Sequence, residues 1–167
     1  IAGIAGAYYF KSYLPGTVAP KSFPQTEGTI QVEGLQDPVS IYRDKMGIPH
    51  IYASTTHDLF LAQGYIHAQD RFWQMDFSRH VGSGSVSEMF GEGQLKTDMF
   101  LRTLGWKQIA EKEFELLSPD SKTILEAYSE GVNAYINGRA PQELSLEYAI
   151  LGLPILTPNY KIAPWTP

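Results

Sequence analysis

The sequence of 167 residues contains no cysteine, which excludes a disulfide framework, a thiolate metal site and a cysteine nucleophile. It also lacks a cluster of basic residues, since 13 Lys and Arg are spread among 18 Asp and Glu for a net charge of -5. A surface that binds nucleic-acid phosphates needs concentrated positive charge. A nucleic-acid partner is therefore not expected.

The common catalytic motifs are missing as well. No G-x-S-x-G turn accompanies His50, His57, His67 or His80, so only composition favours a classical Ser-His-Asp triad. His67 and Asp70 lie three residues apart on a predicted helix and could face one metal ion, but two ligands do not make a site and no H-E-x-x-H motif is present. The alternative for His67 is a hydrogen bond to a neighbouring loop.

Other candidate groups have ordinary structural explanations. Asp76 with Glu88, or the acidic residues between 111 and 115, could form the carboxylate pair of a glycosidase, but alternating Glu residues are typical of a solvated helix face. Aromatic residues at helical spacing between 72 and 77 are more typical of a core than of a stacking site. The sequence thus offers no self-sufficient catalytic constellation.

No apolar run is long enough to cross a bilayer, which takes ~20 residues. Residues 1–10 are apolar and precede Lys11, which predicts the remnant of a signal or membrane-anchor segment, with a plain apolar helix as the alternative. Residues 11–28 are predicted to be a Pro-rich linker without helix or interior strand. Residues 29–167 are long enough for one domain. Export is expected, to the periplasm, to the exterior, or with a membrane anchor upstream of residue 1.

The domain begins with a pattern of short strands. Residues 29–33 and 39–44 alternate apolar and polar side chains, and 50–53 form a third candidate strand. So few strands offer little sheet, and the chain is expected to complete a sheet that belongs mostly to another polypeptide.

Helices follow the strands. Thr55 and Asp58 form a capping pair for a helix that runs to about residue 80, before Gly82 and Gly84. Ser85 with Glu88 predicts a second capped helix, and Ser118 caps a later one. The predicted shorter and later helices cover residues 85–91, 97–104, 106–117, 118–136 and 144–151. The fold class is therefore α+β and mainly helical.

The helix from residue 55 carries a carboxylate on its predicted apolar stripe. The stripe consists of Leu59, Ile66, Trp73 and Phe77. Asp70 lies on the same stripe, where a carboxylate is costly unless it is paired or fully hydrogen-bonded. Arg71, Arg43 and backbone amides are the candidate partners. Asp70, Arg71, Arg43 and His67 are therefore predicted to be structural rather than catalytic residues.

Three segments in fixed order carry a resemblance to a known family. They are R-D-K-M-G-I-P-H-I-Y-A at residues 43–53, G-Y-I-H-A-Q-D-R-F-W-Q-M at 64–75 and G-S-V-S-E-M-F-G at 84–91. Residues 102–105, 127–136 and 164–167 extend the match. From about residue 27 onward the sequence closely resembles the N-terminal part of the small (alpha) chain of the penicillin acylase family.

The resemblance implies an αββα N-terminal-nucleophile hydrolase in which this chain supplements a larger beta chain as a heterodimer. That family hydrolyses amide bonds of N-acylated compounds, namely penicillins and, in relatives, N-acyl homoserine lactones or lipopeptide-like amides. The nucleophile is the N-terminal Ser of the beta chain, exposed by autocatalytic excision of a spacer, with its own α-amine as base.

The resemblance also implies substrate contacts and one calcium ligand in the alpha chain, on a helix just beyond the Trp165-Thr166-Pro167 motif. No catalytic, substrate-binding or metal-binding residue is therefore assigned within this chain, and no organic cofactor is expected. Two alternatives stay open. One is a non-catalytic binding or scaffold module that keeps the alpha-chain surface, and the other is an autonomous hydrolase that uses His67 and Asp70.

Overall fold

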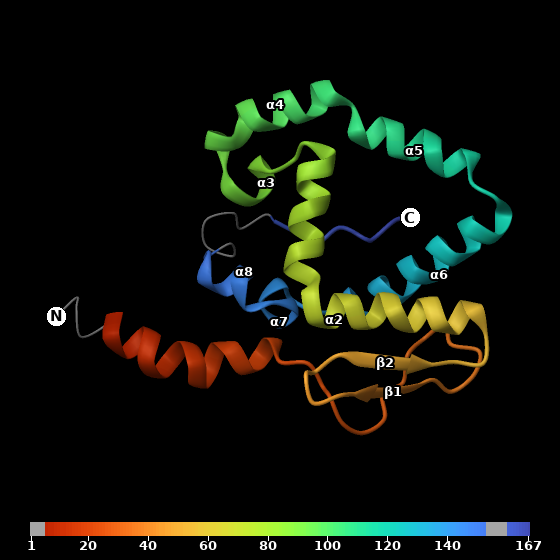
Figure 1. The fold of residues 1–167 in the computed structure, drawn as a ribbon. Coiled ribbons are helices and arrows are strands. Elements are labelled where there is room, and N and C mark those ends of the chain that lie inside the picture. Colours follow the sequence, from red (N-terminus) through yellow and green to blue (C-terminus); the bar gives the residue numbers. More distant parts are fainter. Residues whose placement is uncertain (1–5, 153–159) are drawn as a thin grey trace.

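A computed structural model describes residues 6–152 and 160–167 of the chain (Figure 1). The elements in chain order are η1 (Tyr9–Val18), η2 (Ala19–Ser22), β1 (Ser40–Arg43), β2 (Pro49–Tyr52), α2 (Thr56–Ser83), α3 (Ser87–Phe90), η3 (Glu92–Gln94), α4 (Leu95–Leu104), α5 (Trp106–Leu116), α6 (Pro119–Ile136), α7 (Pro141–Leu144) and α8 (Leu146–Ile150). The first five residues of the predicted anchor segment lie outside the described residues. The prediction of a mainly helical α+β chain is confirmed.

Strands β1 and β2 form an antiparallel hairpin in which Ser40 pairs with Tyr52 and Arg43 with Pro49. The Asp44 carboxylate closes the turn by accepting hydrogen bonds from the backbone N–H groups of Met46 and Ile48 at 2.8 and 3.0 Å. Two of the three predicted strands are thus confirmed.

The predicted strand at residues 29–33 is wrong, because this segment has no regular secondary structure. A strand needs a neighbour for its backbone hydrogen bonds. The only sheet in the part of the chain that the structure describes consists of β1 and β2.

Helix α2 begins as predicted, with the Thr55 hydroxyl oxygen accepting a hydrogen bond from the Asp58 N–H at 3.0 Å. It ends at Ser83, where Gly84 takes the left-handed conformation with φ 63°. The helix bends sharply at Arg71, whose backbone angles of φ -142° and ψ 24° are not helical (Figure 1). The bend directs its first half along the hairpin and its second half toward α3 and α4.

The later helices lie close to their predicted ranges, and Ser118 caps α6 by accepting a hydrogen bond from the Ser121 N–H. The predicted Ser85–Glu88 capping box is wrong. The Ser85 hydroxyl instead contacts the Ser83 hydroxyl at 2.8 Å, and α3 has no side-chain cap of its own. The predicted 144–151 helix is divided into α7 and α8.

The expectation that residues 11–28 hold no helix is also wrong, because η1 and η2 cover residues 9–22. Pro15 lies inside η1 and has no backbone N–H to donate. The turns of η1 are wider than those of an α-helix, and the Ala19 N–H bonds to the Leu14 carbonyl five residues earlier. Helix η1 contains no buried residue.

The core lies where α2 packs against α6. Two glycines let the backbones approach closely: a Cβ on Gly64 would lie 2.0 Å from the Tyr128 carbonyl oxygen, and one on Gly131 would lie 1.8 Å from the Leu61 carbonyl oxygen. Beside this contact the rings of Tyr65 and Tyr135 meet edge to face at 5.2 Å.

The buried face of α2 differs from the predicted stripe. Of its four residues only Ile66 is buried, whereas Leu59 and Phe77 are exposed and Trp73 is partly buried. The face that is buried along the helix contains Asp58, Leu61, Tyr65, Gln69, Phe72, Asp76 and His80. The carboxylates at the centre of the buried face are therefore Asp58 and Asp76, and not Asp70.

Candidate functional site

Asp76 is the most enclosed polar side chain of the second half of α2, with no exposed surface. Arg79, one turn further along the helix, donates a hydrogen bond to it at 2.5 Å. The hydroxyl of Tyr148 on α8 donates to it at 2.6 Å, and the hydroxyl of Tyr160 also donates to it. Sequence reasoning missed this network because Tyr148 and Tyr160 are 72 and 84 residues away.

The same network holds residues 160–167, which we call the exit segment. Arg79 donates hydrogen bonds to the carbonyls of Ala163 and Pro164 at 2.9 and 3.1 Å, and its guanidinium lies over the Trp165 ring. On α6, the Asn133 side-chain amide makes two hydrogen bonds with the Trp165 backbone, at 2.9 and 2.8 Å. The exit segment is thus clamped between α2 and α6.

Both tyrosines of the network stay protonated. Burial, and then the neighbouring Asp76 carboxylate, raise the pKa of Tyr148 and Tyr160 far above the ordinary range. Each hydroxyl therefore acts as a permanent donor to Asp76. A carboxylate with three donors and no exposed surface is suited to holding structure rather than to proton transfer with a substrate.

The structure pairs Asp70 with Arg43 through two hydrogen bonds of 2.8 Å, in a bidentate arrangement. Arg43 also donates to the side-chain oxygen of Gln69 at 3.0 Å. A carboxylate on a buried stripe is expected to be buried and paired: the pairing with an arginine is confirmed, but the Asp70 side chain keeps 24% of its surface exposed. Arg71 is not the partner, because it is exposed at the bend of α2.

His67 and Asp70 do not converge on one point. The His67 Nδ1 atom lies 3.0 Å from the hydroxyl of Tyr128 on α6, whereas Asp70 contacts β1. The expected loop partner of His67 is therefore corrected to a helix residue.

Replacing Asp70 with alanine is expected to lower the free energy of unfolding by about 2 kcal/mol, because it leaves the partly buried Arg43 without its charged acceptor. This is milder than a complete loss of folding, since solvent reaches the pair. Urea denaturation of the two single variants and the Asp70→Ala/Arg43→Ala double variant measures the coupling. Glu115→Ala, which removes an exposed pair with Lys122, is the matched control and should cost less than about 0.5 kcal/mol. Equal effects of Asp70→Ala and Glu115→Ala would contradict the assignment.

Two further buried carboxylates join separate segments. Asp58 accepts hydrogen bonds from the backbone N–H groups of Gln36 and Asp37 at 2.9 and 3.0 Å. The hydrogen bond from Gln36 is the main cause of the lowered pKa of Asp58. Asp98 on α4 accepts from Val86 and Ser87 at 2.7 and 2.9 Å, and so caps α3 in place of Ser85. Burial raises the Asp98 pKa, but the hydrogen bonds outweigh it and lower the pKa overall.

The histidines form no catalytic pair with serine within residues 6–152 and 160–167. Their hydrogen-bond contacts are with Asp44, with Asp58 and Glu130, with Tyr128, and with the Asp76 carbonyl. The same residues contain no group of three or more His, Asp or Glu side chains that could hold a metal ion. They therefore offer no carboxylate cluster that could hold calcium by itself.

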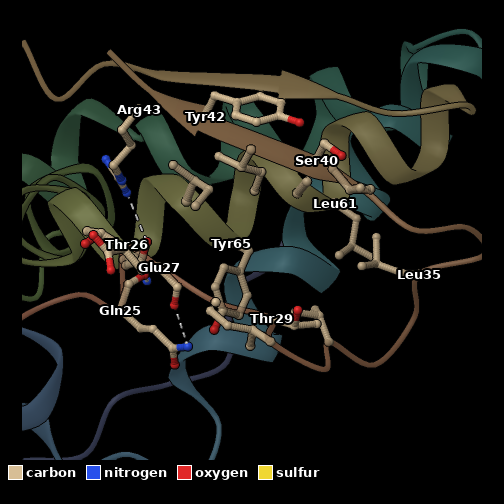
Figure 2. Close-up of a pocket in the computed structure, with 18 residues that line it drawn as sticks. Gln25, Thr26, Glu27, Thr29, Leu35, Ser40, Tyr42, Arg43, Leu61 and Tyr65 are labelled. Atoms are coloured by element: carbon tan, nitrogen blue, oxygen red, sulfur yellow. Dashed lines mark hydrogen bonds between the residues drawn. The ribbon is translucent and has the colours of Figure 1, made fainter. Parts of the chain in front are cut away.

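A cavity of about 360 Å³ lies between residues 25–30, β1 and the first half of α2. Figure 2 shows Leu61 beside Leu35 and Tyr65 beside Thr29 on its walls, with Arg43 at one end. A second, larger groove of about 1020 Å³ is lined by the second half of α2, α5, α6 and the exit segment. Trp106, Leu125 and Trp165 contribute apolar surface to this groove.

Comparisons with known proteins define the class. Residues 38–167 match the penicillin amidase family. The chain is 37% identical over 146 residues to penicillin acylase 2 proenzyme of Pseudomonas sp. strain SE83, which covers 87% of this chain and 18% of that protein. It is 40% identical over 136 residues to the acyl-homoserine lactone acylase QuiP of Pseudomonas aeruginosa, which covers 81% of this chain and 16% of QuiP.

A solved structure supports the same relation. The thermostable penicillin G acylase from Alcaligenes faecalis is similar with a TM-score of 0.64 and 30% sequence identity, over 77% of this chain and 66% of that chain. The chain therefore belongs to the penicillin amidase family. It spans less than a fifth of the length of the curated relatives named above.

Proposed function

We propose that this chain is the N-terminal part of the alpha chain of an exported acylase, which hydrolyses the amide bond of an N-acylated small molecule to a carboxylic acid and an amine. The nucleophile is an N-terminal Ser on a separate beta chain of the same precursor, activated by its own α-amine. The observation that carries the proposal is the match to the penicillin amidase family across residues 38–167. The relatives named above are acylases.

The exposed apolar surface of the chain supports a partner. Helix α5 contains no buried residue, and Trp106, Ile109 and Leu116 on it are exposed. On α4 the side chains of Met99 and Phe100 are exposed as well. Of these residues, Trp106 also lines the large groove. Exposed apolar surface of this kind is typical of a protein interface. We assign this face to the beta chain. The beta chain also supplies strands that extend the two-stranded hairpin into a sheet of the αββα fold.

The substrate belongs to one of two classes. The similarity to a penicillin acylase supports an N-acylated β-lactam, and the similarity to QuiP supports an N-acyl homoserine lactone. Calcium belongs to the assembled enzyme by family resemblance. Because the described residues contain no carboxylate cluster that could hold calcium by itself, its ligands are assigned to other segments of the assembled enzyme.

The test is to express the gene through its continuation beyond residue 167 and to assay the purified protein on penicillin G and on N-acyl homoserine lactones. Release of the acid from either is expected, and the preferred substrate decides between the two classes. Ser→Ala at the N-terminus of the partner chain is the control and should abolish the release. If the assembled protein cleaves neither substrate and other N-acyl amines also remain intact, the chain is a scaffold module and the proposal fails.

A further inference from the structure

The N-terminal helical arm, residues 6–22, presents aromatic side chains to the outside. Tyr8, Tyr9, Phe10 and Tyr13 are 64%, 36%, 65% and 44% exposed. The ring of Tyr9 lies 5.2 Å from that of Phe10 and 5.8 Å from that of Tyr13, so these rings contact one another. We call these four residues the aromatic patch.

The charge of the arm is of one sign. Lys11 and Lys21 are the only charged side chains before Glu27, in a chain whose net charge is -5. The arm is therefore basic and aromatic while the remainder of the chain is acidic. Such a combination complements a negatively charged surface that is apolar beneath.

The arm is attached to the domain at one end. Helix η2 packs against α7 and α8, and η1 precedes it and extends away from the other helices (Figure 1). Both helices precede residue 38, where the match to the penicillin amidase family begins. The aromatic patch is thus separate from the face that α4 and α5 present to a partner.

We propose that the aromatic patch, with Lys11 and Lys21, binds the surface of an anionic lipid bilayer and holds the enzyme there. Tyrosine rings are enriched at the headgroup level of membranes, where the ring is buried and the hydroxyl stays hydrated. The lysine stems extend along apolar surface while their charges contact lipid phosphates. In this proposal the aromatic patch and the two lysines lie at the bilayer surface. No helix among the described residues is long and apolar enough to cross a membrane.

The experiment is co-sedimentation of the purified product of the full gene with vesicles of phosphatidylcholine alone and of phosphatidylcholine mixed with phosphatidylglycerol. Replacing all four patch residues with serine is expected to weaken binding to the mixed vesicles about a hundredfold. Lys11→Gln and Lys21→Gln should each weaken it about fivefold, with no effect on phosphatidylcholine alone.

A matched control removes four exposed apolar side chains outside both the arm and the face of α4 and α5, by Tyr42→Ser, Met46→Ser, Ile48→Ser and Ile150→Ser. This variant should bind the mixed vesicles like the parent chain. Phe10→Trp should gain fluorescence that brominated lipid quenches. Failure of the parent to bind mixed vesicles, equal losses in the patch and control variants, or an unquenched Trp at position 10 would overturn the proposal. None of these outcomes requires acylase activity, so this proposal can fail while the proposed function stands, and the reverse.

Discussion

Replacing Gly131 with alanine is expected to lower the free energy of unfolding by about 3 kcal/mol or more. The added Cβ would lie 1.8 Å from the Leu61 carbonyl oxygen and 2.9 Å from the Tyr65 backbone nitrogen. These are main-chain atoms of α2, so no side-chain rotation can relieve the clash and the two helices must move apart. The better helix propensity of alanine offsets only about 1 kcal/mol.

Gly64→Ala tests the same contact from the other helix, since its Cβ would lie 2.0 Å from the Tyr128 carbonyl oxygen. Gly82→Ala is the control, because Gly82 lies in the same helix with no atom within 4 Å of the added Cβ. It should be neutral or stabilise by up to about 1 kcal/mol. Urea denaturation of the assembled protein measures all three variants. Similar midpoints for Gly64→Ala and Gly82→Ala would show that the helices are not in backbone contact.

Asp76→Ala is expected to lower the free energy of unfolding by about 3–5 kcal/mol. It leaves the partly buried guanidinium of Arg79 without its carboxylate and the two tyrosine hydroxyls without an acceptor. The loss should also release the exit segment, since Arg79 holds the carbonyls of Ala163 and Pro164. Hydrogen exchange of residues 160–167 should then become faster, in addition to the change in the urea midpoint.

Tyr148→Phe is the matched variant for this network. It removes one donor but keeps the Asp76–Arg79 pair. The free energy of unfolding is expected to fall by about 2 kcal/mol, with little change in the hydrogen exchange of the exit segment. An Asp76→Ala protein with the stability of the parent, or an exit segment that exchanges as slowly as before, would refute the role given to Asp76.

Local signals predicted much of the fold. The start of α2 follows from Thr55 and Asp58, which are three residues apart. Its end follows from Gly84, because glycine adopts the left-handed conformation without strain. The phase of the helix was not predictable in the same way. Its buried face contains Asp58, Gln69 and Asp76, so counting apolar residues favours the neighbouring, partly exposed face.

The contacts of the site were predictable only where few partners were available. Arg43 was among the predicted partners of Asp70, because a carboxylate near a helix core needs a charged partner and few are available. The Asp76 network was not predicted, because it joins α2 to α8 and to the exit segment across more than 70 residues of chain. Asp98 likewise caps α3 from α4, where the sequence offered a local serine. Side chains that connect distant segments leave no periodic signal.

The most direct test of the central claim, that this chain acts only with a larger chain beginning in serine, is the intact mass of every polypeptide in the purified product of the longer gene. Two masses are expected, of which the larger corresponds to a chain whose N-terminal residue is Ser, together with amidase activity that the 167-residue chain alone lacks. A single unprocessed chain with full activity, or a stable 167-residue monomer that cleaves N-acyl substrates by itself, would contradict it.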